Sequence, residues 1–175
     1  KVPNDFSFGE LPEDFDHFEP YLQKAMNRVP SLEKVGIRKF FNGPESFTPD
    51  TNYLLGETPE VKNFFVCCGF NSIGIVSSGG AGKVTAEWMI NGEVNDDLFS
   101  LDITRFEKFH SETKFITQRV TETLGNLYAM HWPYKQLKTS RDQKLLPFHH
   151  DLKNKGACFG QVAGYERPMW YALNG

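Results

Sequence analysis

The residues best suited to bind a ligand gather in a glycine-rich segment, residues 69–83, that follows an apolar run at 63–68. A predicted helix at 81–90 comes next, and Asn91-Gly92 is a typical helix stop. Glycines allow a backbone to approach a flat ligand closely, and a helix N-terminus presents unpaired N–H groups and a positive dipole end. This pattern predicts a site for an electron-rich group, although close packing of helix on strand explains the glycines about equally well.

The segment lacks the glycine motifs of the common nucleotide-binding loops. It contains no G-x-G-x-x-G. Lys83 is followed by Val84 where a P-loop has Ser or Thr, and Ser77 stands where the first P-loop glycine would be. The sequence therefore does not support a mononucleotide phosphate site.

Histidines elsewhere in the chain favour structural roles. His149-His150-Asp151 could suggest a metal, but no HExxH or CxxC spacing accompanies it, so we expect a solvated polar patch and no metal site. The segment 131–133 (His-Trp-Pro) could line a pocket, although a packed aromatic turn is the simpler interpretation.

Two further candidates also have a structural interpretation. Cys67 and Cys68 lie in an apolar run with no basic neighbour to activate them, so we expect core thiols. Glu45 and Asp50 could position a substrate amine, but acidic loop residues more often form turns. No catalytic residue can be assigned from the sequence.

The composition excludes several classes of protein. The 175 residues carry a net charge of −3 without a basic block, so a general nucleic-acid or membrane-surface binder is not indicated. No run approaches the roughly 20 apolar residues that span a bilayer. Three cysteines, two of them adjacent, give no disulfide framework and favour a reducing compartment.

Hydrophobic periodicity and turn signals predict elements on both sides of a soft boundary near Gly92. Residues after 129 have little periodicity and are expected to be irregular. The expected elements are a helix at 16–27, a helical turn at 31–33, strands at 37–41, 53–56 and 63–68, and helices at 81–90 and 104–127.

Several ordered motifs resemble the sarcosine and dimethylglycine dehydrogenase family of FAD-dependent oxidoreductases. The likeness covers nearly the whole chain. The motifs are FDHF at 15–18, RVPSLEK at 28–34, GPESFTPD at 43–50, LGETPE at 55–60, FFV at 64–66, GFNSIG at 69–74, GGAGK and AEW within 79–88, DITRF at 102–106 and GYERP at 164–168.

The resemblance implies an α/β fragment with a mixed or antiparallel sheet. Residues 1–92 would be the C-terminal part of the FAD-binding domain, and residues 93–175 a helical and irregular central segment leading to an absent C-terminal domain. The βαβ unit that holds the adenosine and pyrophosphate, and the histidine that links the flavin covalently, would precede residue 1.

The resemblance also implies where the flavin ring would lie. Its pyrimidine edge would face Asn71, Ser72, Ile73, Gly74, Ile75, Val76 and Ser77, whose backbone N–H groups would stabilise negative charge on the reduced ring. Gly43 and Pro44 would approach from the sheet side. Monomeric sarcosine oxidases have a substrate-binding lysine where this chain has Val76, so an arginine or lysine elsewhere must hold the substrate carboxylate.

The implied activity of the whole protein is oxidative demethylation of sarcosine or dimethylglycine with FAD. Tetrahydrofolate could take up the one-carbon unit in the absent domain, and the sequence does not indicate the electron acceptor. The alternative is a non-catalytic regulator, because the regulatory subunit of pyruvate dehydrogenase phosphatase resembles the same family. Bacterial cytoplasm and mitochondrial matrix both suit reduced cysteines.

Overall fold

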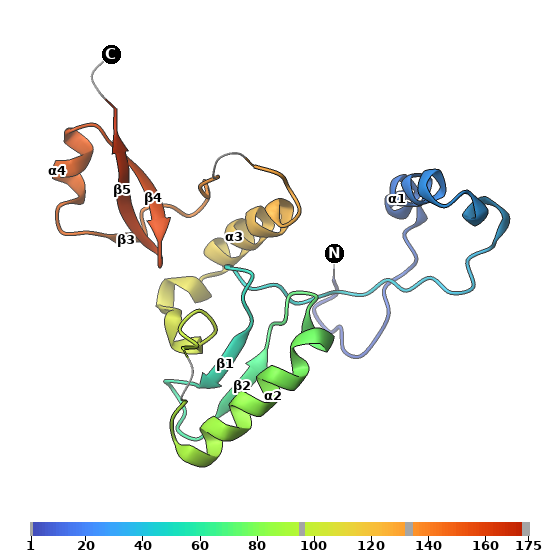
Figure 1. Cartoon of the computed structure of the whole chain (residues 1–175), viewed down its shortest axis with the longest axis horizontal. Coiled ribbons are helices and arrows are strands. Elements are labelled where there is room, and N and C mark those ends of the chain that lie inside the picture. The colour runs from blue at the N-terminus through green and yellow to red at the C-terminus, as the bar shows by residue number, and fades with distance from the viewer. Residues whose placement is uncertain (1, 95–96, 132–134, 173–175) are drawn as a thin grey trace. The chain divides into compact units, whose positions relative to one another are not determined.

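The computed structural model describes residues 2–94, 97–131 and 135–172 (Figure 1). The chain divides into two compact units, Lys1–Glu45 and Ser46–Gly175, and each is described by itself. Helices and small sheets of antiparallel and mixed strands make up the second unit, which confirms the expected α/β class. No described helix is both long enough and apolar enough to cross a bilayer.

The first unit is built on α1 (Phe15–Arg28), followed by the short 3-10 helix η1 (Pro30–Lys34). The side chain of Asp14 accepts from the backbone N–H of His17 at 3.0 Å and caps the helix, which begins one residue before the predicted start at 16. The ring of Phe40 packs on the rings of Phe15 and Phe18, with centroids 4.7 and 5.2 Å apart.

The strand predicted at 37–41 is wrong. This segment forms no strand, and the backbone hydrogen bond beside it runs from Leu11 N–H to the carbonyl of Asn42 at 2.7 Å. A strand needs a neighbouring ladder. Phe40 instead packs on α1, whereas Ile37 and Phe41 are exposed.

The second unit begins with an antiparallel hairpin covered by a helix (Figure 1). Strands β1 (Leu54–Glu57) and β2 (Phe65–Cys68) pair with Leu55 opposite Cys67, close to the predicted strands. Helix α2 (Gly74–Asn91) packs on the hairpin, and Leu55 of β1 and Ala81 of α2 are buried. Gly92, with φ of 78°, ends the helix as predicted.

Two expectations for this part are wrong. Helix α2 begins at Gly74 and not near residue 81, so most of the glycine-rich segment is helical. Cys67 and Cys68 are exposed and not core thiols, because a two-stranded hairpin covered by one helix leaves the outer part of β2 open.

The helix predicted at 104–127 forms only in its second half. The first half contains the 3-10 helices η2 (Ile103–Arg105) and η3 (Lys108–Ser111), and α3 spans Thr113–Asn126. Glu112 is extended, with φ of −68° and ψ of 129°, and therefore separates η3 from α3. Phe115 and Arg119, one turn apart on α3, are buried.

The region after residue 129 is more regular than its lack of periodicity predicts. Strands β4 (Ala157–Val162) and β5 (Tyr165–Tyr171) form an antiparallel hairpin, and β3 (Lys144–Leu145) pairs with β5 in parallel. Helix α4 (His149–Asn154) precedes this hairpin. The two-residue turn between β4 and β5 has positive φ at both positions, 49° at Ala163 and 78° at Gly164, as this kind of tight hairpin turn requires. In the sequence, Gly164 was the one residue that favoured this turn.

Candidate functional site

The expected flavin-facing segment forms a tight turn and the first turn of α2. Gly69, Asn71 and Ser72 have positive φ values of 68°, 48° and 69°, so the backbone reverses sharply after β2. Ile73 is the N-cap residue, and its apolar side chain makes no capping hydrogen bond. The first intrahelical bond runs from Ser77 N–H to the carbonyl of Ile73 at 3.0 Å, which leaves the N–H groups of 74–76 directed beyond the helix end.

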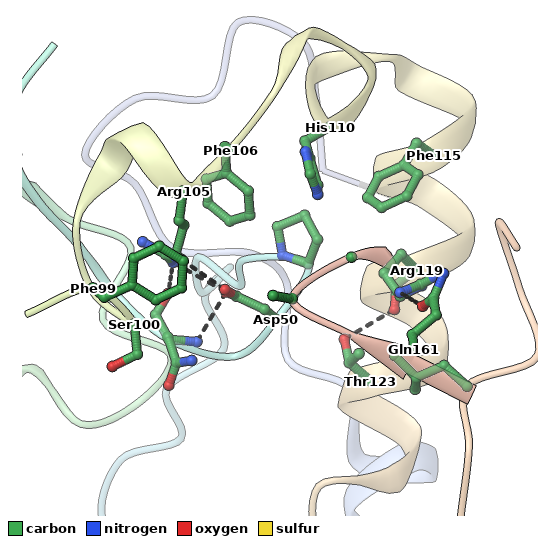
Figure 2. A pocket seen from close by; sticks show the side chains of 15 residues that line it. Asp50, Phe99, Ser100, Arg105, Phe106, His110, Phe115, Arg119, Thr123 and Gln161 are labelled. Atoms are coloured by element: carbon green, nitrogen blue, oxygen red, sulfur yellow. Dashed lines mark hydrogen bonds and ion pairs between the residues drawn. The ribbon is translucent and has the colours of Figure 1, made fainter. Parts of the chain in front are cut away.

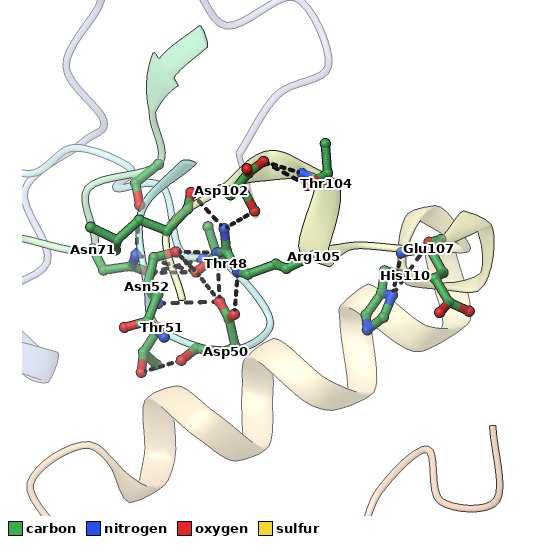
Figure 3. Close-up of polar contacts among 12 residues, drawn as sticks. Thr48, Asp50, Thr51, Asn52, Asn71, Asp102, Thr104, Arg105, Glu107 and His110 are labelled. Carbon is green, nitrogen blue, oxygen red and sulfur yellow. Dashed lines mark hydrogen bonds and ion pairs between the residues drawn. The ribbon is translucent and has the colours of Figure 1, made fainter. Parts of the chain in front are cut away.

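Asn71 holds this turn in place (Figure 3). Its side chain is 6% exposed and accepts from the backbone N–H of Thr48 at 2.8 Å. The amide nitrogen of the same side chain donates to the hydroxyl of Thr48 and to the carbonyl of Gly69. With its side chain engaged inside the protein, Asn71 has only backbone groups to offer a ligand.

The surface of this first helical turn is apolar and open. Ile75 is 96% exposed and Val76 is 81% exposed, and a Cβ added to Gly74 would meet only the side chain of Phe70, at ordinary contact distance. The glycine is therefore not required by packing within the chain. The other expected flavin-facing residues, Gly43 and Pro44, are exposed and belong to the first unit, whereas 71–77 belong to the second.

An ion pair joins two motifs that lie far apart in the sequence, GPESFTPD at 43–50 and DITRF at 102–106 (Figure 3). Arg105 donates to both carboxylate oxygens of Asp50, at 2.7 and 3.1 Å, and to the carbonyl of Asn52 at 2.9 Å. The hydroxyl of Thr48 donates to the carbonyl of Asn52 at 2.7 Å and lies 3.2 Å from a carboxylate oxygen of Asp50. The 48–52 loop is thus fixed to η2 on one side and to the Asn71 turn on the other.

This ion pair shows that Asp50 has a structural partner. A bidentate arginine–carboxylate pair is strong and directional, so the Asp50 carboxylate is committed to Arg105 and the loop. Glu45, the other acidic candidate, is exposed and lies in the first unit. Sequence reasoning did not pair Asp50 with Arg105, although both lie in quoted motifs, because residues 55 positions apart give no local signal.

A cavity of about 450 Å³ opens beside the same loop (Figure 2). The rings of Phe106, His110 and Phe115 lie along one side, and Arg119 and Gln161 lie where α3 meets the β4–β5 hairpin. Burial lowers the pKa of His110, although a hydrogen bond with the backbone of Glu107 and nearby carboxylates oppose this, so the ring is neutral at pH 7. The remaining lining residues are Pro49, Asp50, Asn52, Phe99, Ser100, Arg105, Thr123, Leu137, Ala163 and Gly164.

Arg119 is the residue of this cavity that sequence reasoning missed. It donates to the side-chain oxygen of Gln161 at 2.8 Å and to the carbonyls of Thr139 and Ser140 at 2.6 and 3.0 Å. Burial lowers its pKa, and the nearby carboxylate of Glu122 opposes that effect. The available signal was its position four residues after Phe115, which places a charge on the apolar face of the helix.

The histidine pair is not a solvated patch. His149 is 3% exposed and its ring lies 4.2 Å from the ring of Phe159, whereas His150 is exposed. The described residues contain no group of three or more His, Cys, Asp or Glu side chains placed to hold a metal ion. Of the segment 131–133, only His131 is among the described residues, so the packed aromatic turn expected there stays a prediction.

Two family models match consecutive parts of the chain. The model described as FAD dependent oxidoreductase matches residues 3–88, and the model described as FAD dependent oxidoreductase central domain matches residues 91–145. The first match contains the Asn71 turn and most of α2, and the second contains Arg105 and Arg119.

Three similar proteins match almost the whole chain. A 4-methylaminobutanoate oxidase (formaldehyde-forming) from Paenarthrobacter nicotinovorans is 43% identical over 100% of this chain and 21% of its own length. Mitochondrial sarcosine dehydrogenase from Mus musculus is 39% identical over 98% of this chain and 19% of its own length. The mitochondrial pyruvate dehydrogenase phosphatase regulatory subunit from the same species is 38% identical over 96% and 19%.

The chain spans about a fifth of the length of these curated relatives. The glycine-rich turn, the ion-paired loop and the central segment as far as residue 145 fall within the matched regions. The chain belongs to the family of FAD-dependent oxidoreductases.

Proposed function

We propose that this chain is part of an enzyme that oxidises the N-methyl group of a small N-methyl amino acid with FAD. Within that enzyme, residues 71–77 lie beside the pyrimidine edge of the flavin ring. The observation that carries the proposal is the start of α2 at the apolar N-cap residue Ile73, where the N–H groups of 74–76 lie behind an apolar and open surface.

The first turn of α2 fits such a ring. A helix start favours negative charge near its N–H groups, and the pyrimidine edge carries that charge when the ring is reduced. The side chains of Ile75 and Val76 are exposed, which is unfavourable in water. Contact with the apolar face of a ring would remove them from water. The absence of a Cβ at Gly74 allows close approach.

The flavin supplies hydride acceptance when it is bound. The N-methyl carbon loses a hydride, and the nitrogen lone pair completes a C=N bond. Water then adds to the carbon, and the C–N bond breaks to release formaldehyde and the demethylated amine. In this scheme the backbone of 71–77 orients the ring and favours its reduced state, and tetrahydrofolate bound by another part of the protein would accept the one-carbon unit in place of water.

A regulatory function is the second candidate, because a regulatory subunit is 38% identical to the chain. The fold suits both functions, because the proposal gives none of the described residues a catalytic role. A regulator could retain the Asn71 turn and the Asp50–Arg105 pair as structural features alone.

Anaerobic flavin reduction in the full-length protein separates the two functions. We would mix the flavin-loaded protein in turn with sarcosine, N,N-dimethylglycine and 4-methylaminobutanoate. The absorbance of the oxidised flavin, at about 450 nm, is followed after each addition. The enzyme proposal expects bleaching by at least one of them within seconds, and release of formaldehyde in an amount equal to the flavin reduced, because water alone completes the cleavage. Unchanged absorbance with all three at about 10 mM, well above typical KM values, would support the regulator.

A further inference from the structure

We infer that the cavity beside Arg119 binds a small carboxylate with an apolar body. The cavity occupies about 450 Å³ between η3, α3 and the β4–β5 turn (Figure 2). This volume suits a ligand of the size of a simple aromatic or branched aliphatic acid. The inference concerns a site separate from the 71–77 turn and does not depend on flavin binding.

The charge of Arg119 is the first argument. Its side chain is buried, at 7% exposure, and all three of its hydrogen-bond acceptors are neutral: the Gln161 amide and the carbonyls of Thr139 and Ser140. Its Nε is buried and donates to no described residue. A buried guanidinium without a counter-ion is unfavourable, and a carboxylate supplies that counter-ion.

The neighbouring carboxylates are already engaged. Glu122 accepts from the backbone of Lys138 and from the backbone and hydroxyl of Thr139. Glu166 accepts from Arg141, from the backbone of Asp142 and from the side chain of Gln161. Neither carboxylate forms an ion pair with Arg119 among the described residues. Glu122 and Glu166 attract Arg119 from a distance, but burial outweighs that attraction, so the charge of Arg119 is only partly compensated beside the cavity.

The other charges of the cavity wall cancel. Arg105 is neutralised by Asp50 through two hydrogen bonds, and His110 is neutral at pH 7. The wall thus has a net charge of about +1, so a monoanion would balance it. The rings of Phe99, Phe106 and Phe115 make the rest of the wall apolar, which favours a ligand whose body is apolar.

The test is calorimetric titration of the chain with benzoate and with benzamide, which has the same shape without the charge. We expect benzoate to bind at least ten times more tightly than benzamide. Sarcosine is titrated in the same way. Tighter binding of sarcosine than of benzoate would show that the site takes an amino acid, whereas tighter binding of benzoate would show that it takes a carboxylate without an amine. Equal affinity for benzoate and benzamide, or no benzoate binding at 10 mM, on the order of the weakest useful affinity, would overturn the inference.

A matched pair of variants at Ser100 locates the ligand without disturbing Arg119. Ser100 is exposed and lines the cavity. Ser100→Asp adds a negative charge at the rim, and Ser100→Asn adds a side chain of the same size without charge. We expect Ser100→Asp to weaken benzoate binding about fivefold in low salt and to leave benzamide unchanged. Identical benzoate affinities for the two variants would show that the anion binds elsewhere.

Discussion

Glu166 shows how a charged residue can be completely buried. The side chain is 0% exposed and accepts two hydrogen bonds from Arg141, one from the backbone N–H of Asp142 and one from Gln161. Burial alone would raise its pKa, but the bonds from Arg141 and Asp142 outweigh that effect and the pKa is lowered. The GYERP motif therefore has a structural explanation in this chain.

Replacement of Glu166 by Gln should lower stability and its dependence on pH. Removing one partner leaves Arg141 without its counter-ion, so we expect a loss of about 2–4 kcal/mol in the free energy of unfolding. A lowered folded-state pKa means that the wild-type carboxylate stabilises the fold above the unfolded pKa of about 4.3. That stabilisation is lost as the pH falls through the folded pKa.

Urea unfolding of the chain between pH 7 and pH 3 measures both effects. The variant should lose less of its free energy of unfolding on acidification than the wild type. Glu122→Gln is the matched control, because hydrogen bonds from Thr139 and Lys138 outweigh burial and also lower the pKa of Glu122, although no ion pair is involved. An unchanged pH slope in Glu166→Gln would contradict the assigned role.

Gly74 is where a single residue can test the flavin assignment. Gly74→Val in the full-length protein adds bulk where the ring edge is proposed to lie, whereas within the chain a Cβ there meets only Phe70 at 3.5 Å. We therefore expect normal thermal stability with lower flavin occupancy or slower reduction by substrate.

Gly79→Val is the control for that experiment. A Cβ at Gly79 meets nothing within 4 Å, and the residue lies in the same helix beyond its first turn. This variant should keep full flavin occupancy and normal reduction. If both variants behave alike, or if Gly74→Val loses stability while its bound flavin is reduced normally, the ring does not lie at Gly74.

At the scale of elements, one glycine decides how α2 packs on the hairpin. Gly56 in β1 has φ of +105°, and a Cβ there would lie 2.5 Å from the ring of Trp88. Phe65 of β2 packs edge-on against the same ring. The glycines within α2 differ, since a Cβ at Gly82 meets nothing within 4 Å.

The two kinds of glycine should respond oppositely to alanine. Gly56→Ala combines a strained φ with a clash and should cost about 2–4 kcal/mol. Gly82→Ala improves helix propensity in open space and should stabilise by up to about 1 kcal/mol. Urea unfolding of the chain measures both values. A destabilised Gly82→Ala would show that α2 packs closely on a surface other than the hairpin.

At the scale of the whole molecule, the sequence predicted those elements whose signals are local. Asp14 marks the start of α1, Gly92 marks the end of α2, and the apolar run at 63–68 marks β2. The start of α2 was misplaced because five glycines in 15 residues disfavour a helix, whereas packing of Ala81 and Trp88 on the hairpin stabilises one. Local propensity is overridden there by tertiary contact.

Features that depend on distant residues could not be predicted. The Asp50–Arg105 pair joins positions 55 apart, and the Arg119 hydrogen bond to Gln161 joins positions 42 apart. The β4–β5 hairpin was missed because Pro168 and a bulge at Cys158/Phe159 interrupt the alternation of its strands. The position of the proposed flavin contacts came from resemblance, and the boundary near Gly92 stays a prediction.

The chain alone should bind FAD weakly, because it offers the dinucleotide little beyond the ring-edge contacts of 71–77. The resemblance assigns the adenosine and pyrophosphate to a βαβ unit upstream of these residues, and those groups contribute much of the affinity in such domains. Titration of the chain followed by flavin fluorescence should give a Kd on the order of 100 μM or weaker. Riboflavin is the control. If the ring edge alone is recognised, FAD and riboflavin should bind with similar affinity, whereas stoichiometric FAD binding, or a clear preference for FAD, would show that this chain holds the pyrophosphate as well.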